Sequence, residues 1–113
     1  MSYYSDVCIH MSRAAYDVVK EKYVNDCVGY LLKDSKCDIE DFGSEVILYW
    51  GSIKWYESYV EVSYVMDMLD ALDADDYEWC FVRRGEEYDD IEFIVSDAYS
   101  WNYAHSPHVD ISW

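Results

Sequence analysis

The sequence has few residues that interrupt regular structure and none of the segments that direct a chain to a membrane. Across 113 residues, only Pro107 and four glycines break the chain. No apolar run approaches the roughly 20 residues that cross a bilayer, and the first residues lack the basic and apolar regions of a secretory signal. We therefore expect a single domain, residues 1–113, in the cytoplasm and without a membrane partner.

Positive charge is also scarce. Lysine and arginine number eight against 24 aspartates and glutamates, which gives a formal net charge of −16. Residues 57–113 hold 15 of the acidic side chains and only two basic ones, Arg83 and Arg84. A charge of this size opposes compaction and repels phosphate, so direct binding of DNA or RNA is not expected. It favours a positively charged partner instead.

Disordered acidic chains are usually poor in hydrophobic residues, and this chain is not. Hydrophobic residues make up 52% of the chain, and its 13 tyrosines and five tryptophans are too many for a solvated acidic tail. A chain of this length can bury a core. The composition therefore predicts a folded domain with a charged exterior.

Disulfide and metal-binding patterns are missing as well. The four cysteines are Cys8, Cys27, Cys37 and Cys80. They include no C-x-x-C pair, so without a secretory signal they are expected to be free thiols in apolar surroundings. After Asp73, Tyr77 and Glu78 stand where a calcium loop needs an oxygen ligand and a glycine, and no cysteines and histidines have zinc spacing. No metal or cofactor is predicted.

Alternating apolar residues predict a sheet. Strands are expected at residues 3–11, 45–50, 77–84 and 91–95, with a short strand or loop at 34–43 and an edge strand at 109–113. Residues 45–50 are apolar on both faces, which is typical of a central strand. The dipeptide Gly51-Ser52 is expected to bend or bulge that strand.

Two amphipathic helices are predicted between these strands. The first begins at Ser12, whose hydroxyl can cap it, and runs to about Leu32. The second follows a capping box from Ser58 to Glu61. Its apolar positions recur at helical spacing: Val62, Val65, Met66, Leu69 and Leu72. Two helices on one face of a mainly antiparallel sheet would bury both apolar stripes, so we expect an α+β fold, a ferredoxin-like two-layer sandwich.

Three blocks of the sequence carry a resemblance. They are residues 3–7 (Tyr-Tyr-Ser-Asp-Val), 49–56 (Tyr-Trp-Gly-Ser-Ile-Lys-Trp-Tyr) and 84–92 (Arg-Gly-Glu-Glu-Tyr-Asp-Asp-Ile-Glu). In these blocks the chain resembles small acidic phage-encoded proteins of unestablished activity. In charge and size it is also similar to phage anti-CRISPR and anti-restriction inhibitors, many of which mimic DNA. The resemblance implies an inhibitor acting in a host cell, and it transfers no functional residue.

The sharpest candidate site is an acidic arc along and beyond the second predicted helix. Its members are Asp67, Asp70, Asp73, Asp75, Asp76 and Glu78. Carboxylates three or four residues apart on a helix lie roughly 5–6 Å apart, which approaches the spacing of phosphates along a DNA strand. An ordinary solvated helix face is the alternative. The arc contains no lysine, however, whereas a surface shaped only for solubility normally mixes both signs.

A charged hairpin turn is the second candidate partner-binding site. It consists of Glu86, Glu87, Tyr88, Asp89 and Asp90, with Glu92 following. A tyrosine among carboxylates suits an interface, because aromatic side chains anchor a partner and charges steer its approach. A solvated turn that prevents edge aggregation is an equal alternative.

No catalytic residue is predicted. The imidazoles are His10, His105 and His108, and the pair His105-Ser-Pro-His108 is the best enzymatic hint. No nucleophile elbow, phosphate-binding loop or H-E-x-x-H motif accompanies it. The sequence therefore favours a protein that binds rather than an enzyme.

Three functions remain open from the sequence. The leading hypothesis is a non-enzymatic inhibitor, phage-derived, whose acidic face mimics nucleic acid and blocks a basic groove of a host CRISPR or restriction complex. The alternative is an oligomeric interaction module, such as a homodimer, built on exposed aromatic side chains: Trp50, Trp55, Tyr56, Trp101 and Trp113. The third is a small hydrolase or lyase that uses the histidines.

Overall fold

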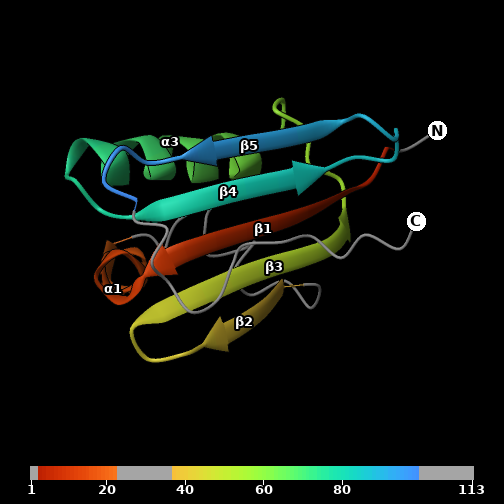
Figure 1. Ribbon diagram of the computed structural model, residues 1–113. Helices are drawn as coiled ribbons and strands as arrows, with labels where there is room; N and C mark the ends of the chain where they lie inside the picture. Colours follow the sequence, from red (N-terminus) through yellow and green to blue (C-terminus); the bar gives the residue numbers. More distant parts are fainter. Residues whose placement is uncertain (1–2, 23–36, 100–113) are drawn as a thin grey trace.

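The computed structural model describes residues 3–22 and 37–99. Their helices and strands follow in the order β1 (Ser5–Ser12), α1 (Arg13–Lys22), β2 (Cys37–Asp41), β3 (Glu45–Ile53), α3 (Val60–Ala74), β4 (Trp79–Arg84) and β5 (Ile91–Val95). The five strands form one antiparallel sheet, ordered β2-β3-β1-β4-β5 (Figure 1). The predicted α+β class with a mainly antiparallel sheet is thus confirmed. Neither described helix has the length and apolar composition that a membrane span requires.

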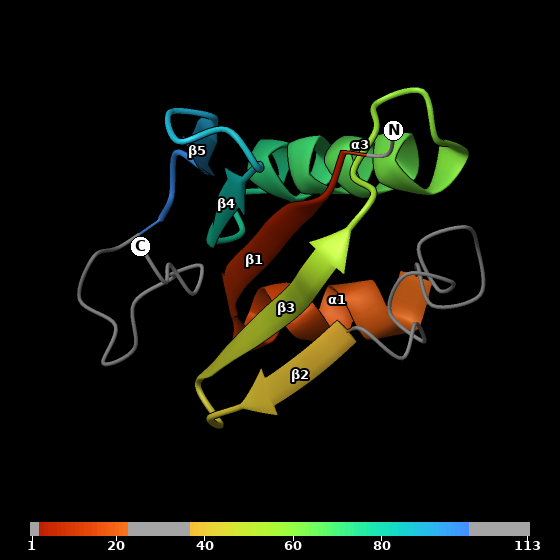
Figure 2. The same ribbon diagram turned by 90° about the vertical axis from the view of Figure 1, so that its right-hand side faces the viewer.

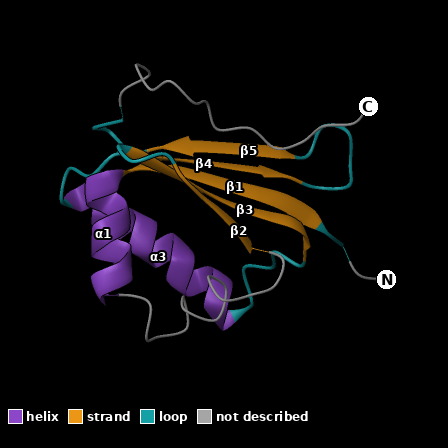
Figure 3. Cartoon of the chain, turned by 90° about the horizontal axis from the view of Figure 1, so that it is seen from below, coloured by secondary structure: helices purple, strands orange, loops and turns teal. Residues whose placement is uncertain are grey.

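Both described helices cover the same face of the sheet. Figure 3 shows α1 and α3 together on one side of the strands. Alternate residues of β1, such as Val7 and Ile9, belong to the same buried cluster as Val19 of α1 and Leu69 of α3. Side chains alternate between the faces of a strand, so this cluster forms the main core. The sheet that carries it twists from β2 at one edge to β5 at the other (Figure 2).

The opposite face of the sheet holds a smaller apolar cluster. Cys8, Ile47, Cys80 and Val82 are buried there, and Tyr99 packs against them. Burial raises the pKa of the Cys80 thiol to about 12, so this group stays protonated at neutral pH. The prediction that cysteines act as small apolar side chains is confirmed for Cys8 and Cys80.

Strand β3 is an interior strand of the sheet, as its two apolar faces predicted. It lies between β1 and β2, and Trp50 is its largest fully buried side chain. The predicted bulge is also present. Ser5 is paired with Ile53 and Val7 with Trp50, so β3 has one extra residue at this point. Ser52 takes up the extra length with a positive φ of 52°.

One of the two predicted N-terminal helix caps is present. The Ser12 cap is confirmed, since its Oγ accepts the N–H of Ala15 at 3.2 Å. The capping box is wrong: α3 has Tyr59 at its N-cap, with no side-chain cap hydrogen bond. The ring of Tyr59 instead packs edge-on against Tyr56, with 5.1 Å between centroids. The helix begins at Val60, so Ser58 lies one residue too early to cap it.

Two tryptophans predicted to be exposed are buried. Trp50 is 0% exposed and Trp55 is 8% exposed. Trp50 points from the middle of the sheet toward the helices, and Trp55 packs on it and on Phe81, with ring centroids 5.7 and 6.1 Å apart. Tyr56 is half-buried. The exposed aromatic side chains of the described residues are others: Tyr4, Phe42, Tyr59, Tyr64, Tyr88 and Phe93.

Several predictions fall outside the described residues. They concern the first helix beyond Lys22, the edge strand at residues 109–113, and four side chains of the C-terminal segment: Trp101, His105, His108 and Trp113.

Candidate functional site

The outward face of α3 carries the first part of the acidic arc. Asp67 and Asp70 are exposed, and neither forms an ion pair with another described residue. Asp73 is half-buried, and its Oδ1 accepts the backbone N–H of Asp97 at 2.8 Å. Asp73 therefore ties the end of α3 to the segment after β5, while Asp67 and Asp70 present their charge to solvent.

The second part of the arc follows from how α3 ends. Asp76 adopts a positive φ of 61°, and its N–H donates to the carbonyl of Asp73 at 3.0 Å. The next N–H, of Tyr77, donates to the carbonyl of Leu72 at 2.9 Å. This is the pair of bonds of a Schellman motif, with aspartate where glycine is commonest. The turn leaves Asp75 and Asp76 exposed and Glu78 half-buried at the entry to β4.

This placement of negative charge works against the helix. The carbonyl end of a helix carries partial negative charge, so an exposed carboxylate there costs about 0.3–1 kcal/mol, whereas a lysine would be favourable. The last turn of α3 has no basic residue, while Asp73, Asp75 and Asp76 lie in that turn or just beyond it. The helix dipole thus does not explain these three carboxylates, of which Asp73 also bonds Asp97 and Asp76 also ends the helix. Local rules are often broken in this way at functional sites.

The β4–β5 turn holds one acidic residue with a structural role. The carboxylate of Asp90 accepts two hydrogen bonds from the guanidinium of Arg83, at 2.7 and 3.2 Å, and one from the hydroxyl of Tyr3 at 2.6 Å. The Arg83 guanidinium, followed by the Tyr3 hydroxyl, lowers the pKa of Asp90 below its usual value. Asp90 therefore joins the turn to β4 and the N-terminal segment, and its charge is offset within the protein.

The other acidic residues of this turn are exposed to solvent. Glu86 accepts the backbone N–H of Tyr4 at 2.8 Å and is exposed. Glu87 and Asp89 are exposed, and Tyr88 is 80% exposed between them. The turn therefore presents an aromatic ring between carboxylates, the combination for which the sequence singled it out.

The two acidic clusters do not form one continuous surface. The acidic end of α3 leads into β4, and the turn leaves β4 at its other end (Figure 1). Six residues of strand separate them, a length of about 17–20 Å. A single partner would have to contact both ends of β4 to use both clusters.

The Arg83–Asp90 pair gives a pH prediction. The pKa of Asp90 is lowered from 3.8, so its stabilising contribution is present above the unfolded pKa and is lost as pH falls through the lower folded value. Asp90→Asn should lower the melting temperature at neutral pH and make stability less dependent on pH below about 4. Thermal melts across pH test this, with the exposed neighbour Asp89→Asn as control. If the melting temperature of Asp90→Asn falls at acidic pH as steeply as that of the wild type, the structural role of Asp90 is contradicted.

His10 is buried, and both of its ring nitrogens contact side chains of other described residues. It is 0% exposed, with Nε2 at 3.1 Å from Glu45 Oε1 and Nδ1 at 2.9 Å from the Tyr99 hydroxyl. Both ring nitrogens are thus engaged inside the protein, where the ring meets no solvent. In residues 3–22 and 37–99, no group of three or more histidine, cysteine or acidic side chains is arranged to hold a metal ion.

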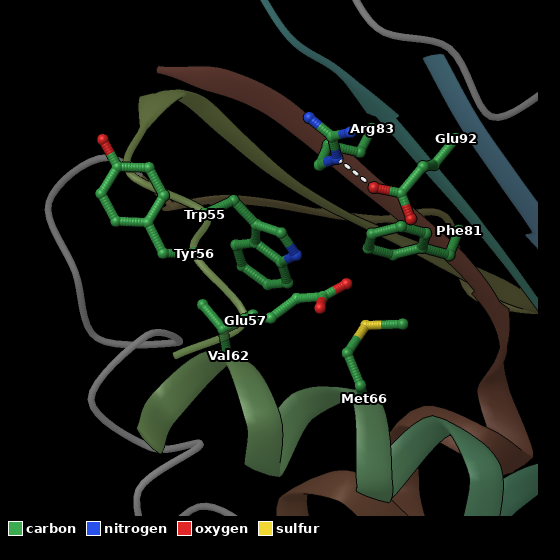
Figure 4. Close-up of a pocket in the computed structure, with 8 residues that line it drawn as sticks. All are labelled: Trp55, Tyr56, Glu57, Val62, Met66, Phe81, Arg83 and Glu92. Atoms are coloured by element: carbon green, nitrogen blue, oxygen red, sulfur yellow. Dashed lines mark hydrogen bonds and ion pairs between the residues drawn. The ribbon is translucent and has the colours of Figure 1, made fainter. Parts of the chain in front are cut away.

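A pocket beside α3 was not predicted from the sequence. It has a volume of about 320 Å³ and is lined by Trp55, Tyr56, Glu57, Val62, Met66, Phe81, Arg83 and Glu92 (Figure 4). These residues come from the segment between β3 and α3, from the first half of α3, and from strands β4 and β5. Only the spacing of Val62 and Met66, and of Phe81 and Arg83, gave a local sign that they share a face. Their convergence depends on the packing of α3 against the sheet.

Comparison with protein-family models, curated proteins and solved structures gives no match for this chain.

Proposed function

We propose that the protein is a non-enzymatic inhibitor, phage-derived, that binds a basic nucleic-acid-binding groove of a host defence complex of CRISPR or restriction type. Its acidic surface occupies the groove in place of phosphates. Inhibition is steric and electrostatic competition in the cytoplasm of the host, and it involves no chemical step.

The observation that carries this proposal is the row of carboxylates at the carbonyl end of α3. Asp67, Asp70, Asp75 and Asp76 are exposed and have no ion pair among the described residues. Two of the four, Asp75 and Asp76, stand where the helix dipole disfavours negative charge. Cationic side chains of a partner would offset both the mutual repulsion and the unfavourable dipole interaction. The free protein is therefore less stable for carrying a surface that a basic partner would stabilise.

The scaffold for this surface is proposed to be a ferredoxin-like unit with an added strand. The order β1, α1, β2, β3, α3, β4 alternates as in the split β-α-β motif. The five-stranded sheet departs from that plan through β5, at the edge beyond β4. In this reading, α3 and the start of β4 are held rigidly, so the carboxylates keep a fixed spacing.

A second function is favoured by the exposed side chains of β5. Ile91, Phe93, Ile94 and Val95 are 36–51% exposed, and among the described residues β5 pairs with β4 alone. An apolar edge strand of this kind can pair with another chain. An oligomeric interaction module, for example a homodimer through β5, is therefore the alternative proposal.

Salt dependence separates these two functions. Immobilised protein should retain a nucleic-acid-binding component of a defence complex from bacterial lysate, and duplex DNA should displace it. The affinity of the purified pair should fall about tenfold or more between about 50 and 300 mM salt, because exposed charges are screened. Isothermal titration across a salt series measures this. A flat response, or binding that DNA leaves unchanged, would contradict nucleic-acid mimicry and favour the apolar interface.

A further inference from the structure

Exposed aromatic and apolar side chains gather around the start of α3 and the β4–β5 turn. Tyr59, Tyr64 and Tyr88 are 40%, 47% and 80% exposed, and Val60, the first residue of α3, is 55% exposed. Val60 and Tyr64 are four residues apart on the helix, so their side chains are neighbours on its outer surface. We call these four residues the tyrosine patch. Exposed apolar side chains that lie together on a soluble protein often mark a binding site.

The N-terminal segment joins the two parts of this patch. The backbone N–H of Tyr3 donates to the hydroxyl of Tyr56 at 2.6 Å, just before α3. The Tyr3 hydroxyl donates to Asp90 at 2.6 Å and accepts the N–H of Glu87 at 3.0 Å, both in the turn. Tyr56 packs edge-on against Tyr59. The turn and the start of α3 therefore lie at the same end of the sheet, at the right of Figure 1 and facing the viewer in Figure 2.

The turn is held in one backbone conformation. The N–H of Gly85 donates to the carbonyl of Asp90 at 2.8 Å, and the N–H of Asp90 donates to the carbonyl of Glu87 at 3.1 Å. Gly85 is required here, because a Cβ at this position would collide with the Asp90 carboxylate and the Tyr3 ring. A turn that served only to keep the sheet edge soluble would need no such fixation. A fixed turn instead lowers the entropy that a partner loses with it on binding.

Carboxylates surround the tyrosine patch. Glu57, Glu86, Glu87 and Asp89 are exposed. Their charge repels the phosphates of nucleic acids and of anionic lipids, so neither suits this surface. Cationic side chains suit it, because they bind both carboxylates and the faces of tyrosine rings. The protein itself has such a contact at this end, since Nζ of Lys54 lies 5.8 Å from the centroid of the Tyr4 ring.

We propose that the tyrosine patch and its surrounding carboxylates are a docking surface for a protein segment that carries arginine side chains. A planar guanidinium stacks on a tyrosine ring and donates paired hydrogen bonds to a carboxylate, whereas the ammonium group of lysine acts as a point charge. Tyrosine and arginine are also the side chains that dominate many interfaces. The patch lies at the start of α3, away from the carboxylates at its carbonyl end, so this inference does not rest on the proposed function.

A peptide titration tests the patch directly. A short peptide of alternating glycine and arginine is added to the full chain at about 150 mM salt, where long-range attraction to the net charge is screened. NMR resonances of Tyr59, Tyr64 and Tyr88 should shift. The corresponding lysine peptide should bind about threefold or more weakly, because ammonium groups stack poorly on tyrosine. Equal affinity of the two peptides, or shifts confined to the carboxylates of α3, would overturn the proposal.

A double variant that keeps the net charge locates the binding. Tyr64→Ser with Tyr88→Ser should weaken binding of the arginine peptide about fivefold or more, because two stacking contacts are lost. The control is Ile39→Ser with Phe42→Ser, at side chains that are 42% and 39% exposed on β2 and just beyond it. It should leave the affinity within about twofold, and thermal melts establish that both variants fold. Because neither variant alters the charge, equal affinities would show that bulk electrostatics alone binds the peptide, and the proposal would fail.

The titration also separates this inference from the proposed function, because it uses no host component. If the arginine peptide does not recognise the tyrosine patch, the inference fails and nucleic-acid mimicry by the carboxylates of α3 is unaffected. If no partner that DNA displaces is captured, the proposed function fails, and the peptide titration still decides whether the patch binds arginine.

Discussion

Replacing Trp50 by alanine should lower the free energy of unfolding by about 3–5 kcal/mol, the usual cost of removing a large aromatic side chain from a core. Trp50 is 0% exposed and lies between the sheet and the helices, where it packs against Trp55. Domains of this size are stable by only about 5–15 kcal/mol, so the variant should melt far below the wild type or fail to fold. Urea denaturation followed by circular dichroism measures the loss.

Tyr88→Ala is the matched control for this prediction. Tyr88 is 80% exposed, so its removal should change stability by no more than about 0.5 kcal/mol. The two variants also test the finding that Trp50 is buried, because the sequence analysis had predicted it in an interface. A Trp50→Ala protein that keeps its stability and loses only its association with other chains would restore that reading.

Reversing the charge of Asp67, Asp70 and Asp75 together should abolish binding to the proposed basic partner without unfolding the protein. A close charge pair at an interface is worth about 1.5 kcal/mol or more, and three such pairs correspond to about a thousandfold in affinity. Stability should hold or rise, because lysine is favourable near the carbonyl end of a helix. Asp73 and Asp76 are left unchanged, since one bonds Asp97 and the other ends the helix. Calorimetry and thermal melts give both quantities.

A second triple variant controls for bulk charge. Glu21, Asp38 and Glu40 are exposed and lie on α1 and β2, away from α3. Their reversal to lysine changes net charge by the same amount. Binding should weaken only modestly, through reduced long-range steering. Equal losses in both variants would show that total charge is sufficient, and equal retention would show that the carboxylates of α3 are an ordinary solvated face.

Periodicity and chain order made most of the local structure predictable. The alternation along residues 77–84 and 91–95 located β4 and β5, and the spacing of Val65, Leu69 and Leu72 located the buried side of α3. These signals are local, because a strand or a helix repeats its faces every two or 3.6 residues whatever it packs against. The acidic character of the α3 end was visible for the same reason.

The sequence by itself thus determined the α+β class, the central β3, the buried thiols of Cys8 and Cys80, and the carboxylates available for a partner. Only the tertiary structure decided which aromatic side chains are buried, since Trp50 and Trp55 disappear beneath helices that approach from elsewhere in the chain. It also decided that the two acidic clusters lie at opposite ends of β4, that Asp90 is neutralised by Arg83, and that a pocket forms beside α3. These features depend on contacts between residues far apart in sequence. Such contacts leave no periodic pattern in the chain, because they arise from how whole elements pack.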